Sequence, residues 1–470
     1  MTKTTPRTAS VLAVVSAAVF MASLDLFVVN VAFPDIQSGF AGSTLADLSW
    51  ILNGYTIVFA ALLVPLGRAA DRRGRRRFFI GGLLLFVASS AAAAAAPSLE
   101  ALVAARVIQA VGAAALMPAS LALLLAEVPL QKRSAAIGVW AATGGIAAAA
   151  GPPLGGLLVQ ASWRWVFLIN LPVGLAAAVA AARVLRESSD PAHARKPDVL
   201  GAVLLVVAIG MLALGLVKAP DSGWTDPRTV STLATSALTL IAFVVRSARH
   251  PAPVVELAML RVRSFSMAAT AALLFSAGFG AMLLGGVLFL TQVWDYSVLK
   301  AGIAFAPGPL MAAVFAVPTG RLGPRVGPHL LTALGGAVFG VGAAWWALRM
   351  GSEPAFASEL LPGMILTGIG VGLTLPSVSA AAVSELPPAR FATGSAVLQM
   401  ARQLGIALGV AILIAILGHP TPEQALDRFH DGWWFIAGAG FAAAIAGIRI
   451  PAPERQRRST TALAAESARG

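Results

Sequence analysis

Cysteine is absent from this 470-residue sequence, and charged residues are scarce. The missing thiol excludes disulfides, cysteine nucleophiles and thiolate metal sites. Asp, Glu, Lys and Arg make up only 12% of the chain, against about 25% in soluble domains, whereas hydrophobic residues reach 58%. A soluble protein needs more charged residues than this to cover its water-exposed surface. The composition therefore indicates a protein that lies in a lipid bilayer.

Long apolar runs account for most of the chain. A membrane-spanning helix needs about 20 residues, and the sequence predicts fourteen such helices, grouped six, two and six, in an all-α polytopic membrane protein. The predicted spans are 10–32, 48–67, 78–96, 101–126, 134–159, 165–185, 199–217, 228–245, 265–291, 301–320, 329–348, 358–382, 394–417 and 432–450.

The polar stretches between these runs divide the chain into four parts. We expect an N-terminal six-helix bundle (1–186), a segment with polar connectors and the inserted helices 7 and 8 (187–263), and a C-terminal six-helix bundle (264–450). The polar tail (451–470) is expected to be disordered because it has too few apolar residues to form a core.

Basic residues alternate between the loops in a way that predicts the orientation. Most Lys and Arg residues fall in the loops on one side, as the positive-inside rule requires of the cytoplasmic side, so both termini are expected to be cytoplasmic. The same rule accounts for the net charge of +13 without nucleic-acid binding. Arg106 and Arg402 lie inside spans, and the opposite loops hold only Arg164, Lys218, Arg228, Lys300, Arg349 and Arg428.

The loop after the second span has a dense pattern of glycine and charge, from Gly67 to Arg77. Glycine permits a tight turn and close helix approach, and Asp71 at the membrane edge can accept hydrogen bonds from a helix N-terminus or pair with arginine. Such contacts suit a latch that holds one conformation. We call its predicted members the loop latch: Gly67, Asp71, Arg72, Gly74 and Arg75.

This loop resembles the signature of the major facilitator superfamily, with Ala69 in place of the usual leucine. Segments 24–34, 162–174 and 402–405 are similar to motifs of its fourteen-helix drug:proton antiporter branch, although Phe27 replaces the usual threonine. The resemblance implies two pseudo-symmetric six-helix bundles around a central cavity that opens alternately to the two sides.

The fifth predicted span carries a glycine-proline string that is similar to the antiporter motif of this superfamily, with Ala147 as its one departure. Any single glycine is explained by helix packing, because small residues let helices approach closely. The whole string resembles exporters and not importers, and it is the main sequence argument for efflux. Its members are Gly138, Gly151, Pro152, Gly155 and Gly156.

Two charged residues inside the first bundle, Asp25 and Arg106, are candidates for proton coupling. Burial disfavours the charged form of a carboxyl group, which makes its protonation switchable, and an intramembrane arginine needs a partner or an aqueous cavity. The alternatives are capping or surface exposure for Asp25 and snorkelling to the membrane interface for Arg106. The resemblance favours the coupling role for both.

Candidate residues for a substrate cavity are fewer and less specific: Asn30, Gln109, Phe275, Phe279 and Gln292. For the three from the ninth span, packing or lipid contact is the favoured explanation. Because the second bundle has no carboxylate deep within it, a neutral, monocationic or weakly acidic amphiphile is favoured over a dication.

The function that these patterns predict is proton-coupled efflux of small amphipathic compounds such as drugs or antibiotics across the cell membrane. No phosphate-binding loop of the GxxxxGK[ST] type is present, which excludes ATP as the energy source on sequence grounds. The alternatives are a proton-coupled uptake symporter of a small metabolite and a membrane-embedded enzyme or sensor. We expect no enzymatic activity, cofactor or metal site, and a monomer whose partners are protons, the substrate and the lipid bilayer.

Overall fold

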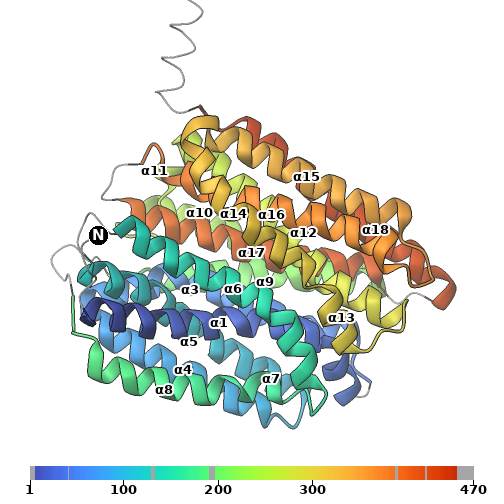
Figure 1. Cartoon of the computed structure of the whole chain (residues 1–470), viewed down its shortest axis with the longest axis horizontal. Helices are drawn as coiled ribbons and strands as arrows, with labels where there is room; N and C mark the ends of the chain where they lie inside the picture. Colours follow the sequence, from blue (N-terminus) through green and yellow to red (C-terminus); the bar gives the residue numbers. More distant parts are fainter. Residues whose placement is uncertain are drawn as a thin grey trace, which may run out of the picture.

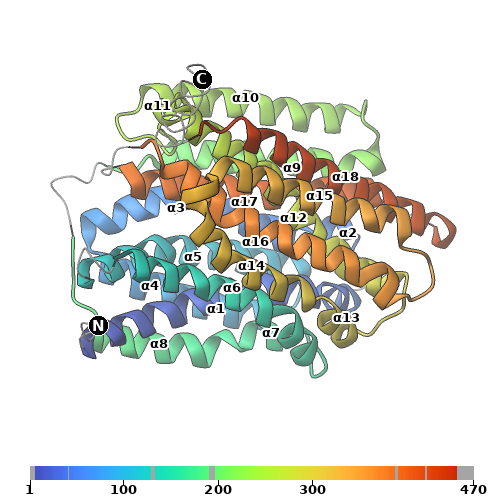
Figure 2. The ribbon, with the colours of Figure 1, turned by 45° about the horizontal axis from the view of Figure 1, so that its top comes forward.

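The computed structural model describes residues 6–40, 42–128, 133–189, 196–386, 390–418 and 421–452, and these parts are helical throughout. Fourteen of the described helices are long and apolar enough to cross a membrane, which confirms the predicted number. The long helices run side by side along one axis (Figures 1 and 2). The predicted tail beyond 452 and the middle of the first connector, 190–195, lie outside the described residues.

The N-terminal half contains six long helices and two short ones that turn the chain between them. Thr44 and Asp47 form a reciprocal capping box at the start of α2, and the Ser98 side chain caps α5. The helices are α1 (Pro6–Gly39), α2 (Leu45–Leu48), α3 (Trp50–Arg73), α4 (Arg75–Ala94), α5 (Leu99–Glu127), α6 (Arg133–Val159), α7 (Trp165–Leu168) and α8 (Asn170–Val184).

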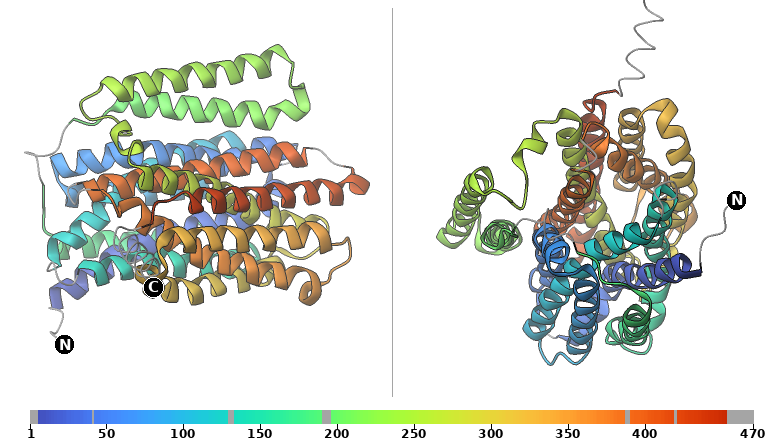
Figure 3. Two further views of the ribbon diagram at one scale, coloured as in Figure 1. Left: turned by 90° about the horizontal axis from the view of Figure 1, so that it is seen from above. Right: turned by 90° about the vertical axis from the view of Figure 1, so that its left-hand side faces the viewer.

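Two further long helices, α9 (Val199–Ser222) and α10 (Pro227–Arg249), form a hairpin at the side of the molecule. Figure 3 shows this hairpin, in green, set apart from the other helices. Of the two, α9 packs against both α3 and α17 (Phe391–Leu417), whereas α10 packs almost entirely on α9. The short helix α11 (Leu257–Leu260) leads from the hairpin into the C-terminal half.

The C-terminal half repeats the arrangement of the first. In one half α1 packs on α6, α3 on α5 and α4 on α5, and in the other α12 packs on α17, α14 on α16 and α15 on α16. The helices are α12 (Arg263–Gln292), α13 (Val298–Ala304), α14 (Pro307–Val326), α15 (Pro328–Arg349), the π-helical turn η2 (Phe356–Leu360), α16 (Leu361–Val383), α17 and α18 (Pro422–Ile448).

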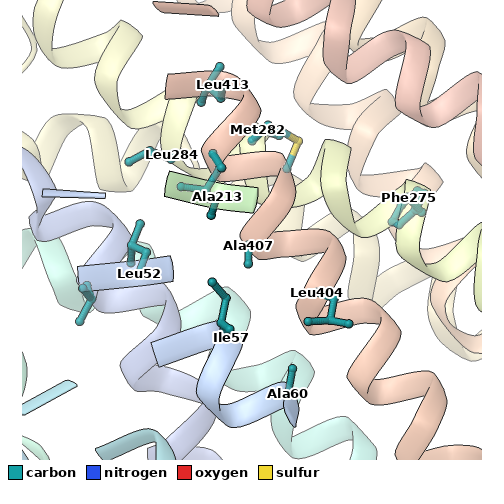
Figure 4. Packing of buried hydrophobic residues seen from close by; sticks show 14 of the residues in the cluster. Leu52, Ile57, Ala60, Ala213, Phe275, Met282, Leu284, Leu404, Ala407 and Leu413 are labelled. Carbon is teal, nitrogen blue, oxygen red and sulfur yellow. The ribbon is translucent and has the colours of Figure 1, made fainter. Parts of the chain in front are cut away.

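We name the two ends of the molecule by their charge. The basic end is the end at which α3 finishes with Arg72 and Arg73, and the opposite end is the end at which α1 finishes and α13 lies. The halves meet along α3 and α17, where Ile57 and Ala60 lie beside Leu404 and Ala407 (Figure 4). All four belong to one continuous apolar core that joins the halves.

A second contact between the halves lies at the opposite end. There α6 packs closely on α13. A Cβ atom on Gly156 would lie 2.7 Å from the Cα atom of Leu299. A Cβ atom on Gly302 would overlap the carbonyl oxygen of Pro152. Gly145, at the middle of α6, and Gly320, in the basic-end half of α14, are exposed and have open space around them. The halves are therefore in close contact at the opposite end, through α6 and α13.

Candidate functional site

Asp25 lies at the centre of a buried polar cluster in the N-terminal half. Its side chain is fully buried, which excludes the surface exposure considered from sequence, and it accepts hydrogen bonds from three side chains. Arg106 donates to Oδ2, while Gln109 and Asn170 donate to Oδ1 at 3.1 and 2.9 Å. The carboxylate charge is thus balanced by one cation and two amide donors.

Arg106 is buried as completely as Asp25, so it does not snorkel to the interface. Its Nε donates to the backbone oxygen of Ile51 at 3.2 Å, and Nη1 also donates to Gln109 Oε1 at 2.6 Å. The guanidinium carbon lies 4.2 Å from the centre of the Tyr55 ring, a cation–π geometry that offers the charge a second partner. The structure therefore brings Asp25, Arg106 and Gln109 together, three residues that the sequence placed in spans but did not pair.

Two members of the cluster were not singled out from sequence as site residues. Ser90 of α4 accepts hydrogen bonds from Gln109 and Asn170 at 2.7 and 3.2 Å, and Asn170 begins α8. The sequence signal for Ser90 was weak, because it is one serine among alanines, and Asn170 appeared only within the motif-like segment 162–174. We call the five residues Asp25, Ser90, Arg106, Gln109 and Asn170 the Asp25 cluster. They come from α1, α4, α5 and α8, so their hydrogen bonds join four helices.

The other predicted cavity residues lie apart from this cluster. Asn30 is half-buried and donates to the backbone oxygen of Leu26, one turn earlier in α1. Phe275 is fully buried with its ring 4.7 Å from that of Phe339, so the structure places it in the core between α12 and α15. Phe279 is half-buried on α12, and Gln292 is exposed at the end of the same helix.

The antiporter-like motif of α6 contacts both halves. Gly151 packs against Phe27 of α1, and a Cβ atom on Gly155 would lie 3.2 Å from the backbone oxygen of Val28. Pro152 and Gly156 face α13 of the C-terminal half. Gly138 lies in the first part of α6. The motif therefore forms a seam between α1 and α13 at the opposite end, where the halves are closed together.

The loop latch occupies the turn from α3 to α4 at the basic end. Asp71 pairs with Arg75 at 2.7 Å, whereas Arg72 is exposed. Gly74 has φ +121°, a conformation that favours glycine, and Gly67 packs on Pro118 of α5. Of the two partners considered for Asp71, the structure has the arginine.

The N-terminus of α4 is capped instead by Glu187, a residue that the sequence placed in a connector without a role. Its carboxylate accepts hydrogen bonds from the backbone N–H groups of Arg76 and Arg77 at 2.9 and 3.3 Å. An anion there is favoured by the helix dipole and satisfies two free N–H groups. Because Gly74 lies directly against this carboxylate, a side chain at position 74 would displace it.

No group of three or more His, Cys, Asp or Glu side chains that would suit a metal ion occurs among the described residues. The Asp25 cluster instead offers one buried carboxylate whose charge is balanced by an arginine and two amide groups.

Comparison with known proteins identifies the family. The profile of the Major Facilitator Superfamily matches residues 15–410. The chain belongs to this superfamily. Its described fold agrees with that assignment: the solved structure of the POT family transporter PepTSo superimposes with a TM-score of 0.69 at 15% sequence identity, covering 95% of this chain and 97% of that one.

Several curated relatives are resistance or export proteins by name. The chain is 34% identical to the multidrug resistance protein Stp of Mycobacterium tuberculosis over 87% of this chain and 76% of the relative. It is also 34% identical to the tetracenomycin C resistance and export protein of Streptomyces glaucescens, over 89% and 77%. The methylenomycin A resistance protein of Bacillus subtilis is 32% identical over 93% and 91%.

Proposed function

We propose that this protein exports small amphipathic compounds, such as drugs or antibiotics, across the cell membrane in exchange for protons. The names of its relatives, which describe resistance and export, support the direction and the substrate class. In the orientation that we propose, the basic end and both termini face the cytoplasm, in agreement with the positive-inside rule.

The Asp25 cluster is the observation that carries the proton coupling. A proton that binds Asp25 removes the negative charge that holds Arg106, and the guanidinium then keeps its contacts to Ile51, Gln109 and the rings of Tyr55 and Phe167. Because these partners lie on other helices than α1, protonation weakens the tie between α1 and α5. Loss of the proton restores that tie.

The closed seam at the opposite end supports alternating access. Because α6 is packed on α13 there, a substrate enters from the cytoplasm in this conformation. Rotation of the two halves then opens the seam and closes the basic end, which carries the substrate outward.

Everted membrane vesicles from a host that lacks its own drug pumps test this proposal. Respiration acidifies their interior, so an exporter is expected to accumulate ethidium or the amphipathic acid fusidate, and substrate addition is expected to dissipate the pH gradient. Collapse of the gradient by nigericin should abolish accumulation. Accumulation in right-side-out vesicles would support uptake instead, and chemical conversion of the compound without a gradient would support an enzyme.

A further inference from the structure

Arg402 is the one charged residue in the middle of the C-terminal spans. It is eleven residues from the start of α17, about 16 Å at 1.5 Å per residue, and the other charged residues of these helices lie toward their ends. A cation at such a depth in a membrane protein is costly unless it has a partner or faces an aqueous cavity. Its surroundings therefore indicate what it does.

The Arg402 side chain lies on a narrow accessible stripe of an otherwise buried helix segment. Ser395, Gln399, Arg402 and Ile406 are exposed or half-buried, and their spacing puts them on one face of α17. This stripe lies between the face of α17 that packs on α12 and the face that packs on α3. Arg402 is half-buried between these two packed faces, so its guanidinium keeps partial access to its surroundings.

The charge of Arg402 has no carboxylate partner among the described residues. Its recorded hydrogen bond is from Nη1 to Oε1 of Gln399, at 3.2 Å. Arg106, in the other half, differs in this respect because Asp25 balances its charge. This arrangement leaves most N–H donors of the half-buried Arg402 guanidinium without an anion to bind.

We propose that Arg402 binds the anionic group of an exported compound, so that the substrates include amphipathic acids that carry a carboxylate or sulfonate. This inference rests on the proposed export function and narrows the substrate class. A guanidinium binds such groups through two parallel hydrogen bonds, and a lysine does so less well because it is a point charge. The side-chain oxygen of Gln399 accepts a hydrogen bond from Arg402, so its amide N–H group can donate to the same anion. Ile406, on the same face, offers an apolar contact to the body of the substrate.

The test compares fusidate, a carboxylate, with the cation ethidium in proteoliposomes that have an imposed pH gradient. Arg402→Gln is expected to lower fusidate transport roughly tenfold to a hundredfold, the range for loss of a charge-assisted hydrogen bond, with ethidium transport unchanged. Arg402→Lys should retain part of the fusidate transport. Arg428→Gln, which removes an exposed arginine at the start of α18, is the matched control and should transport both compounds normally.

Because the chain has no cysteine, Arg402→Cys gives a second measurement that does not depend on the stability of the glutamine variant. Aminoethyl methanethiosulfonate restores a positive charge at this position and is expected to restore fusidate transport, whereas the sulfonatoethyl reagent is not. Two outcomes overturn the proposal that Arg402 binds an anion while leaving the export function intact. In the first, the wild type exports ethidium but not fusidate. In the second, fusidate export survives both Arg402→Gln and the anionic reagent. Transport of neither compound contradicts the proposed export function itself.

Discussion

Asp25 and Arg106 each carry a charge that the other makes tolerable inside the membrane. Removing one partner of a buried ion pair typically costs on the order of 3–5 kcal/mol, because the remaining charge stays buried without compensation. We therefore expect Asp25→Asn to abolish proton-coupled transport and also to lower the thermal stability of the detergent-solubilised protein. Arg106→Gln should do the same.

The double variant Asp25→Asn/Arg106→Gln separates the two effects. It removes both charges and keeps amide groups that can hydrogen-bond with Gln109 and Asn170, so its melting temperature is expected to recover most of the loss. Transport should remain absent, because no carboxylate is left to carry the proton. Recovery of proton-coupled transport in the double variant would show that the cluster is structural only.

Asp25 and Arg106 were recognisable from sequence as single residues but not as a pair. An acid or a base inside an apolar span is recognisable one residue at a time, whereas the pairing joins α1 to α5 across 81 residues of chain. Ser90 escaped notice because a short polar side chain is common in apolar helices, and Asn170 was noted only as part of segment 162–174. For Phe275 the sequence favoured packing or lipid contact over a cavity role, and the structure packs it against Phe339.

At the scale of single helices, hydropathy predicted the number of membrane-spanning helices. The span boundaries were less accurate: the last helix was predicted to start at 432 and begins at Pro422. Its first ten residues include Glu423, Asp427 and Asp431, which hydropathy excludes from a span. Glu423 is in the first turn, where the helix dipole favours an acidic residue. The cap by Glu187 was missed for a related reason, because the path of a connector is not encoded by a pattern in the connector itself.

The α6 helix provides a matched pair of glycines for testing the seam at the opposite end. Gly156→Ala places a Cβ atom 2.7 Å from the Cα atom of Leu299, so α6 and α13 must separate, at a cost of about 1–3 kcal/mol. We expect this variant to transport substrate several-fold more slowly. Gly145→Ala, in the same helix but with open space around it, should transport at the wild-type rate.

Initial rates in proteoliposomes, normalised to the amount of folded protein, distinguish the two glycines. Both substitutions add the same methyl group and raise helix propensity equally, so a difference in rate reports on the contact between α6 and α13. Equal rates in the two variants would mean that the seam does not take part in the transport cycle.

At the scale of the whole molecule, the hairpin of α9 and α10 is tied to the N-terminal half at both ends. Lys218 of α9 pairs with Asp47 at 2.8 Å at the opposite end. At the basic end Arg68 of α3 donates to the backbone oxygens of Ala252 and Pro253, in the segment that follows α10, and pairs with Glu256 at 3.2 Å. These ties predict that the hairpin moves with α3 when the halves rotate, and that its apolar contact with α17 slides.

Two pairs of introduced cysteines test that motion in a chain that has none of its own. The first pair is Pro220→Cys in α9 and Gly418→Cys just after α17. Cβ atoms at these positions lie 3.9 Å apart, which is within the range of a disulfide. Oxidation of this variant should therefore join the hairpin to the C-terminal half. We expect this bond to block transport and its reduction to restore it. Asp47→Cys/Lys218→Cys, joined by a short bismaleimide, should transport as well as its uncrosslinked form.

The single variants Pro220→Cys and Gly418→Cys control for the loss of the proline and of a glycine with φ +53°. If the 220–418 disulfide leaves transport intact and the 47–218 crosslink blocks it, the hairpin moves with the C-terminal half, and the ion pairs to α2 and α3 must break in each cycle. Inhibition by both crosslinks would mean that the hairpin moves relative to each half. Its position would then depend on its apolar packing against α3 and α17, and not on the ion pairs at its ends.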